Sequence, residues 1–453
     1  MNKPKIVAGL GIAALVILFP MTLHAQSLSE VLVDLVLSDI QLRESPPGFL
    51  RHVAHFAAAN NPDIVPVPFQ FNRTVLAQLS TFPLGSSAGG FTSTYDPALG
   101  TSTRNSTTFG PAFTERALTI GRKKFNFGAT YEHTSYNSFE GKDLKNNDVK
   151  FYISHEPCCP GQFFEGDLVE AALRLDLSTD TFSIFGNYGV GDHLDIGVAV
   201  PFVHVDMNAT STATILTLAT DGIPIHRFPD GTTQQIFRGG GTASGIGDIV
   251  LRAKYNFWAQ PGGGLAGGVD LRLPTGDDAN LLGTGATQTK LLLIYSGTAN
   301  KVSPHVNFGY TFSGESTDLN QSLLAGIGNP SVDSNLLPSV VDEVNYAGGL
   351  EVELSPKVTL VGDLIGRTLR GFGRLETTTH TFTFKDAQGN PGSKDFEIFN
   401  YQSTANLNLV LAAVGAKINP AKNLLVSAHV LFPLTDAGLR SRFTTVLGFD
   451  YAF

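Results

Sequence analysis

Cysteine is nearly absent from this chain. Its 453 residues include two cysteines, and these are neighbours, Cys158 and Cys159. A bond between adjacent cysteines is strained, and two adjacent thiols beside His155 do not have the spacing of a zinc site. The sequence therefore predicts no metal site. A strained loop disulfide and two loop thiols are the alternatives for this pair.

Positive charge and long apolar runs are also scarce. The chain has 31 lysines and arginines against 40 aspartates and glutamates, a net charge of −9. Nucleic-acid binding requires basic patches, so nucleic acid is excluded as a partner. After residue 25 there is no run of about 18 apolar residues, the length that a spanning helix needs. The strand pattern must therefore decide between a soluble and a membrane protein.

The first 25 residues have the composition of a secretory signal peptide. Lys3 and Lys5 precede an apolar stretch at 6–23, and Ala25 ends a small-residue cleavage site. An uncleaved membrane anchor is the alternative, because the stretch approaches the length of a span. We predict a cleaved signal peptide over 1–25 and export by the general secretory route, with the mature chain starting near Gln26.

Glycine and phenylalanine are abundant instead, with 48 and 32 residues. Glycine weakens helices and phenylalanine favours strands. From about residue 73 apolar and polar residues alternate, most clearly in 194–202, 249–257, 265–273 and 306–312. Soluble sandwiches also alternate, so the pattern alone does not decide the class.

The lengths of the connections separate the two classes. Tight connections are expected at 189–192, 260–264, 298–302, 355–357 and 419–422, and long ones at 137–168, 209–245, 275–287, 314–341, 372–401 and 434–441. Short and long connections alternate strictly, which is typical of an outer-membrane barrel with short periplasmic turns and long outer loops.

We therefore predict an all-β protein, a transmembrane antiparallel up-and-down β-barrel of about 14 strands, within a range of 12–16, over residues 73–453. The strands are expected at 74–95 (the least defined), 107–120, 124–136, 171–188, 193–207, 246–258, 265–274, 288–298, 303–313, 342–354, 358–371, 403–417, 423–433 and 442–453.

Residues 26–72 differ from the rest and are predicted to be helical or extended. Ser27 opens a capping box and begins a predicted helix that runs to Leu42 and is apolar on most sides. A second short helix is expected over 49–59, before an extended proline-rich stretch at 61–68. A helix apolar on most sides has to be buried, so this segment is predicted to be a plug inside the barrel or a docked periplasmic segment.

The middle of the chain resembles a known family. The segments GIGDI at 245–249, RAKY at 252–255, GGVDLRLPTGD at 267–277 and NLLGTG at 280–285 carry the resemblance, together with DIGVAVPF at 195–202. They are similar to outer-membrane transporters named for the meta-cleavage pathway of phenol degradation, distantly like long-chain fatty-acid channels. The resemblance covers about residues 170–453 and implies a channel for hydrophobic or aromatic compounds.

Charged residues in this region are predicted to line the lumen. Their apolar neighbours point the other way, and a lysine or arginine facing lipid near the midplane would cost about 2–4 kcal/mol. The candidates are Asp248, Arg252, Lys254, Asp270, Arg272, Glu351 and Glu353. The two glutamates, with Asp363 on the next strand, could complete a salt-bridge lattice or bias a pore toward cations.

Patterns suggesting other chemistry are weak. The glycines at 239–241 lack the helix that a phosphate loop needs, and Asp277 and Asp278 lack the glutamate that closes an EF-hand loop. Ser427 and His429 share a strand face without a third orienting group. We therefore predict no catalytic residues, no cofactor and no metal, and the protein is not predicted to be an enzyme.

The last strand supports a location in the outer membrane of a Gram-negative-type bacterium. Leu447, Phe449, Tyr451 and Phe453 share one face, and the last three resemble the signal read by the barrel-assembly machinery. Predicted partners are this machinery, outer-membrane lipid and a small-molecule solute. The leading hypothesis is a channel for small, hydrophobic or aromatic compounds. A surface structural or adhesin barrel and, third, a lipid-modifying enzyme are the alternatives.

Overall fold

The computed structural model describes nine stretches of the chain: residues 26–43, 66–81, 85–86, 90–96, 101–104, 106–155, 163–220, 225–315 and 340–453. The predicted signal peptide, the predicted helix over 49–59 and the Cys158–Cys159 pair lie outside them. No helix in these stretches is long and apolar enough to cross a membrane.

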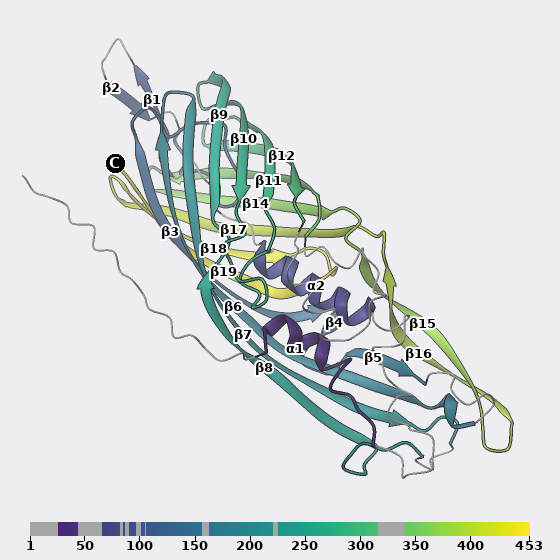
Figure 1. The fold of residues 1–453 in the computed structure, drawn as a ribbon. Helices are drawn as coiled ribbons and strands as arrows, with labels where there is room; N and C mark the ends of the chain where they lie inside the picture. Colours follow the sequence, from purple (N-terminus) through teal and green to yellow (C-terminus); the bar gives the residue numbers. More distant parts are fainter. Residues whose placement is uncertain are drawn as a thin grey trace, which may run out of the picture.

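Twelve antiparallel strands form a closed barrel (Figure 1). The ring closes because β3 pairs with β19 on one side and with β6 on the other. The strands are β3 (Phe125–Phe139), β6 (Leu168–Gly189), β7 (Leu194–Leu216), β9 (Val250–Gln260), β10 (Gly263–Arg272), β11 (Gln288–Ser296), β12 (Val302–Ser313), β13 (Glu343–Ser355), β14 (Val358–Leu369), β17 (Leu407–Ala421), β18 (Leu424–Pro433) and β19 (Leu439–Ala452).

Side chains alternate across the barrel wall as lipid contact requires. On β12, Phe308 is 58% exposed while Asn307 beside it is 6% exposed. On β19, Phe449, Tyr451 and Phe453 point outward with the other large apolar residues of the wall. The barrel thus has an apolar outer surface and a largely polar interior.

Short and long connections lie at opposite ends of the barrel, as predicted. Tight turns join β6 to β7, β9 to β10, β11 to β12, β13 to β14 and β17 to β18, all at one end of the barrel. We call this end the short-turn end; it also holds the start of β3, where the Phe453 N–H donates to the Phe125 carbonyl at 2.8 Å. The opposite, long-loop end carries the longer connections.

Two of the fourteen predicted strands are wrong, and twelve form the barrel. The first predicted strand, 74–95, starts inside helix α2 (Pro66–Ser80), which covers 74–80 and also replaces part of the extended stretch expected at 61–68. Prolines fit the first turn of a helix, where their missing N–H is not needed. The second, 107–120, has no regular secondary structure and lies in the lumen. The barrel strands therefore begin at Phe125 rather than near residue 73.

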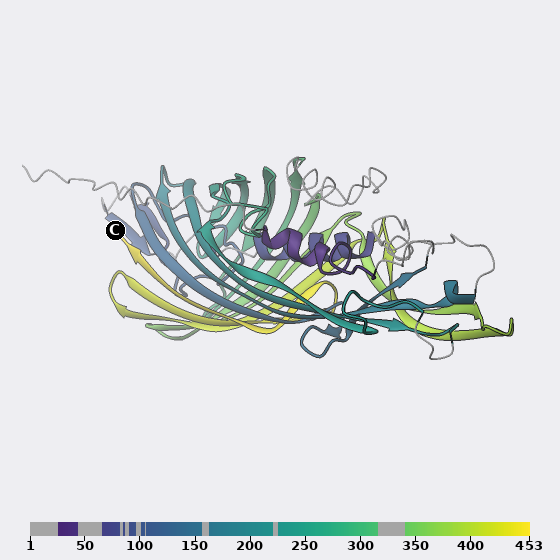
Figure 2. The same cartoon turned by 60° about the horizontal axis from the view of Figure 1, so that its bottom comes forward.

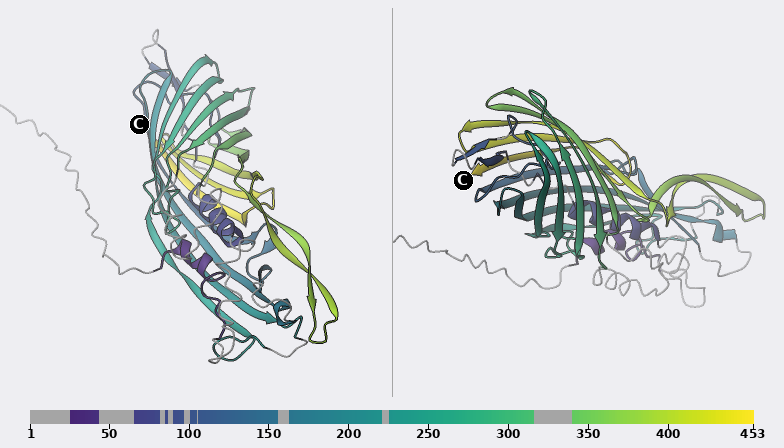
Figure 3. Two further views of the ribbon diagram at one scale, coloured as in Figure 1. Left: turned by 45° about the vertical axis from the view of Figure 1, so that its right-hand side comes forward. Right: turned by 90° about the horizontal axis from the view of Figure 1, so that it is seen from above.

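Several predicted loops contain further strands. In the predicted connection 209–245, β7 continues to Leu216 and pairs with β8 (Gln234–Ile246). The predicted connection 372–401 is mostly a hairpin that projects from the long-loop end (Figure 3). The remaining strands are β1 (Ser93–Asp96), β2 (Thr101–Arg104), β4 (Lys142–Asp143), β5 (Val149–Ser154), and the hairpin strands β15 (Arg374–Lys385) and β16 (Pro391–Gln402).

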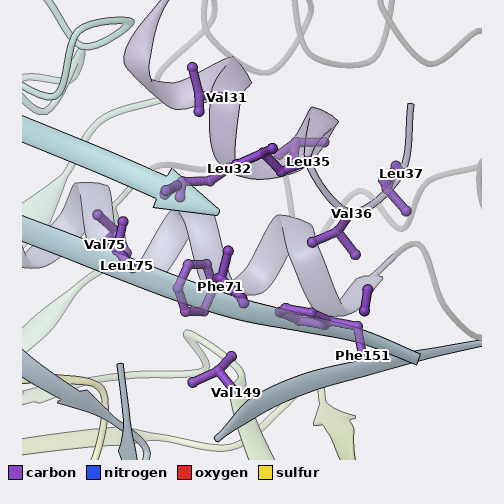
Figure 4. Close-up of a cluster of buried hydrophobic side chains, with 14 of the residues drawn as sticks. Val31, Leu32, Leu35, Val36, Leu37, Phe71, Val75, Val149, Phe151 and Leu175 are labelled. Atoms are coloured by element: carbon purple, nitrogen blue, oxygen red, sulfur yellow. The ribbon is translucent and has the colours of Figure 1, made fainter. Parts of the chain in front are cut away.

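Beyond the long-loop end of the ring, β5, β6, β7 and β8 continue as an open curved sheet. Helix α1 (Leu28–Asp34) and α2 lie on its concave face (Figure 2). Their buried side chains, among them Leu32, Phe71 and Val75, pack against Phe151 and Leu175 of the sheet (Figure 4). The predicted apolar helix at the N-terminus is therefore buried, but it ends at Asp34 rather than Leu42.

Candidate functional site in the lumen

An irregular segment, residues 106–121, crosses the lumen near the short-turn end. Two wall carboxylates accept hydrogen bonds from its backbone. Glu351 Oε2 lies 2.9 Å from the Gly110 nitrogen, and Asp363 Oδ2 lies 3.0 Å from the nitrogens of both Ala112 and Phe113. We call this segment together with α2 the plug.

Polar side chains of seven further wall positions complete this arrangement. Asn307 accepts from the Glu115 N–H at 2.6 Å and donates to the Glu115 carbonyl at 2.8 Å. Lys417 donates to the Pro111 carbonyl at 2.6 Å. The others are Asp195, Lys254, Asn256, Ser296 and Thr359. Buried irregular backbone needs such partners, and here the barrel wall provides them.

A buried histidine stands behind the two carboxylates. His305 Nε2 lies 2.8 Å from Asp363 Oδ1, and His305 Nδ1 lies 3.6 Å from Glu351 Oε1. All three side chains are at most 1% exposed. The cluster fixes the carboxylates that hold the plug.

The C-terminal end of α2 is held by arginines from three strands. Arg272 donates to the Ser80 carbonyl at 2.5 Å, and Arg367 donates to the Thr81 carbonyl at 2.9 Å. Arg252 donates to the Gly85 carbonyl just beyond, at 2.7 Å. Cations there satisfy the free carbonyls of the last turn and oppose the negative end of the helix dipole.

Two cavities remain between the plug and the wall. The larger, which we call the large lumen cavity, has about 1520 Å³ free of protein atoms and lies beside β9–β14 and β17–β19. The smaller has about 1180 Å³ and lies beside β3, β6, β7, β18 and β19. Phe113, Arg252 and Arg272 line both, so the plug and two wall arginines separate them.

A third cavity, which we call the aromatic cavity, opens at the long-loop end. It has about 1210 Å³ free of protein atoms and lies between the start of α2, β5 and the β15–β16 hairpin. Tyr152 lies within its wall, and burial together with a hydrogen bond to Glu170 raises the pKa of this phenol. Its aromatic lining consists of Phe151, Tyr152, His380, Phe382, Phe399 and Tyr401.

The charged residues predicted to line the lumen fall into three groups. Arg252, Asp270 and Arg272 line the large lumen cavity. Lys254 and Glu351 are buried against the plug backbone. The remaining two are Asp248, which lines the smaller cavity, and Glu353, which is half-buried at the short-turn end of β13.

Asp248 explains the glycine-rich segments that carry the family resemblance. Its carboxylate accepts hydrogen bonds from the Gly276 N–H at 3.1 Å, and from the Thr284 N–H and hydroxyl at 2.8 and 2.7 Å. A Cβ on Gly276 or Gly283 would lie 2.7 Å from the Cα of the other, so only glycine fits both positions. These residues tie the loop after β10 to the bend between β8 and β9.

That loop in turn contacts α1. The Ser29 N–H donates to the Ala279 carbonyl at 3.1 Å, and Leu281 and Leu282 belong to the same apolar core as α1. The segments of the resemblance therefore have a structural role that links the barrel wall to the N-terminal helix.

The residues considered for other chemistry lie in two places: Ser427 and His429 line the smaller cavity from β18, and Asp277 and Asp278 lie in the loop after β10. His429 points into the smaller cavity, with its ring 6.1 Å from that of Phe113. Asp277 bonds to Asn280 in an exposed loop. Among the residues that the structure describes, no group of three or more His, Cys, Asp or Glu side chains is arranged to hold a metal ion.

Sequence reasoning missed most of the plug contacts. They include four inward residues near the short turns of three different strands: Asp195 on β7, His305 and Asn307 on β12, and Lys417 on β17. Their shared signal is a polar residue on the inner face close to a tight turn, which by itself also fits a water-filled lumen.

Comparison with protein families adds one match. Residues 166–328 match the model of the family described as "Putative MetA-pathway of phenol degradation". The sequence resemblance is confirmed over this range. The match includes Asp248 and the glycine-rich loop that it holds, while residues 329–453 of the predicted resemblance lie outside it. A comparison with curated proteins gave no match.

Several solved structures align with most of this chain at low similarity. A FadL homologue of Pseudomonas aeruginosa is 11% identical, with 82% of this chain and 97% of that chain covered and a TM-score of 0.34. The toluene transporter TbuX of Ralstonia pickettii is 12% identical, with 83% and 99% covered and a TM-score of 0.36. The toluene transporter TodX of P. putida is 11% identical, with the same coverage and a TM-score of 0.33. These low scores support no argument, and the barrel is established by the strand pairing of this chain itself.

Proposed function

We propose that this protein is an outer-membrane channel for small, hydrophobic or aromatic compounds. The observation that carries the proposal is a closed barrel with an apolar outer surface around a lumen that contains cavities and a plug. The match to the phenol-degradation family supports the same class of cargo.

The proposed orientation places the short turns in the periplasm and the long loops outside, as in single-chain barrels. The outward residues Phe449, Tyr451 and Phe453 would then be read by the assembly machinery after removal of the signal peptide at 1–25. Lipid would contact the exposed apolar side chains of the wall.

The aromatic cavity is the proposed entry site. Its rings offer apolar surface to a solute arriving from outside, and burial of an aromatic molecule there is favourable by about 25 cal/mol per Å² of apolar surface. Phe151 and Phe399 stand with ring centroids 6.1 Å apart in its wall. The solute would next reach the lumen cavities beside α2.

The plug is the proposed gate. In this proposal segment 106–121 closes the lumen near the short-turn end. Its hydrogen bonds to wall side chains are worth about 0.5–1.5 kcal/mol net each, and about 1.5–3 kcal/mol where the partner is charged. We extend the plug predicted over 26–72 to include 106–121, because that segment crosses the lumen.

A flux assay in liposomes tests the proposal. Purified wild-type protein and the double variant Glu351→Gln/Asp363→Asn are compared for uptake of phenol and toluene. Both should show flux above empty liposomes, and the double variant should be faster because its plug is held less firmly.

Glu353→Gln is the matched control for this assay. It lies two residues from Glu351 on the same strand face, and its carboxylate has no hydrogen bond or ion pair within the described stretches. It should transport at the wild-type rate. Absence of flux in all three proteins would overturn the channel and favour a surface-binding barrel.

A further inference from the structure

The large lumen cavity has more cationic than anionic side chains on its wall. Its carboxylates are Glu115, Asp270 and Glu343. Its cations are Arg252, Arg272, Lys290, Arg367 and Arg440. The eight residues come from six different strands and the plug, so only the closed ring brings them to one cavity.

The carboxylates are already in ion pairs. Arg252 lies 3.3 Å from Asp270 and 3.7 Å from Glu115, and Arg367 lies 2.6 Å from Glu343. Each carboxylate of the cavity therefore lies within 4.0 Å of Arg252 or Arg367.

Three cations are left over. For Arg272, Lys290 and Arg440, no carboxylate among the residues with defined positions lies within 4.0 Å. Arg440 donates to the Thr435 hydroxyl at 2.6 Å, and its buried Nε has no hydrogen-bond partner. Positive charges in a partly buried space attract an anion strongly, because water screens them less than at the surface.

The facing wall is apolar. Ile365, Leu409, Leu411 and Leu431 line the same cavity from β14, β17 and β18. In the ring, β17 and β18 lie across from β9 and β10, which carry Arg252 and Arg272. The apolar residues thus face the strands of Arg252, Arg272 and Lys290, while Arg367 and Arg440 lie beside the apolar residues on β14 and β19.

We infer that the large lumen cavity binds small aromatic carboxylates. The ring lies against the leucines of β17 and β18, and the carboxylate is directed to Lys290 and Arg272 on β11 and β10. A neutral ring compound would leave these cations unpaired, and a cationic one would be repelled. The inference rests on the proposed channel function and specifies its cargo.

Part of the cationic excess has another role. Arg272 and Arg367 also hold the carbonyls at the end of α2, so a plug-holding role accounts for these two. It does not account for Lys290, whose side chain has no hydrogen bond or ion pair within the described part of the chain. Lys290 is therefore the residue that distinguishes an anion site from a plug anchor.

Calorimetry in detergent with sodium benzoate and with benzyl alcohol tests the inference, because the two ligands share a ring and differ in charge. Wild-type protein should bind benzoate more tightly than benzyl alcohol, and high salt should weaken the binding of benzoate. Lys290→Gln should weaken benzoate binding about tenfold or more, as expected for loss of a charged hydrogen bond, and leave benzyl alcohol unchanged.

Two further variants sharpen the result. Lys301→Gln removes an exposed lysine from the turn after β11 and should change nothing. Asp270→Asn removes the carboxylate opposite Lys290 in the β10–β11 pairing and should strengthen benzoate binding. If benzoate binds no more tightly than benzyl alcohol, or equally well to Lys290→Gln, the inference is overturned. Flux of phenol and toluene in the liposome assay would then still support the channel.

Discussion

The two ends of the lumen are filled in different ways. At the short-turn end, an irregular segment is held by carboxylates, amides and lysines of the wall, such as Asp363 and Asn307. At the long-loop end, α1 and α2 pack against apolar side chains of the sheet, such as Phe151 and Leu175. Strand β6 therefore packs against a helix at its long-loop end and lines a polar lumen at its short-turn end.

The difference follows from where backbone hydrogen bonds can be made. A helix satisfies its own N–H and C=O groups, so an apolar surface can cover it. An irregular segment cannot, so the wall around it must provide donors and acceptors. The polarity of the inner face is set by the secondary structure of what it encloses.

The largest expected effect is at Asp363, which accepts four hydrogen bonds. Asp363→Leu should leave the Ala112 and Phe113 N–H groups without an acceptor, at a cost of about 1–3 kcal/mol each. Hydrogen exchange in micelles should then accelerate at 109–115. Exchange of the α2 amides should stay at the wild-type rate. If 109–115 stays protected, the plug is held by other contacts.

Phe71→Ala tests the apolar packing of α2 at the long-loop end. Phe71 is 1% exposed, and its ring centroid lies 4.4 Å from that of Phe139. The change should cost about 3–5 kcal/mol and speed exchange in α2 while sparing 109–115. The control is Phe443→Ala, an outward residue that is 54% exposed. Faster exchange in both regions would show that the two halves are one cooperative unit.

The smallest expected effect concerns the loop held by Asp248. In Gly283→Ala the new Cβ would lie 2.6 Å from Asp248 Oδ1, and relieving this overlap should cost about 1–3 kcal/mol. Limited proteolysis should then cut the loop at 276–284 faster while the barrel stays intact. Gly191→Ala, whose Cβ would meet open space, is the control. Equal cleavage of both variants would refute the role assigned to this glycine.

The barrel could be predicted because contact with lipid requires apolar residues at every second position of every strand. Alternation in stretches such as 306–312 and the sorting of connections by length both hold in the structure. Each is a local property of the chain that does not depend on what fills the lumen.

The plug could not be predicted in the same way. Helix α2 buries Gln70, Asn72 and Arg73 as well as its apolar residues, so its sequence shows no amphipathic stripe. Segment 107–120 resembles a strand by composition, but its hydrogen-bond partners are side chains from strands far away in the sequence. Both strand predictions here failed because the interior of the barrel, rather than water or lipid, surrounds these residues.

The sequence alone determined the class of fold, the direction of its surfaces and the short and long connections, since these follow from local alternation and from turn residues. The sequence also contains the glycines around Asp248, but the close contact between Gly276 and Gly283 that requires them is visible only in the structure. Only the tertiary structure decided that twelve strands close the ring and that 106–121 occupies the lumen. It also decided that Lys290 lines a cavity with no carboxylate of the described residues within 4.0 Å of its ammonium group. These depend on ring closure, which brings together residues more than a hundred positions apart.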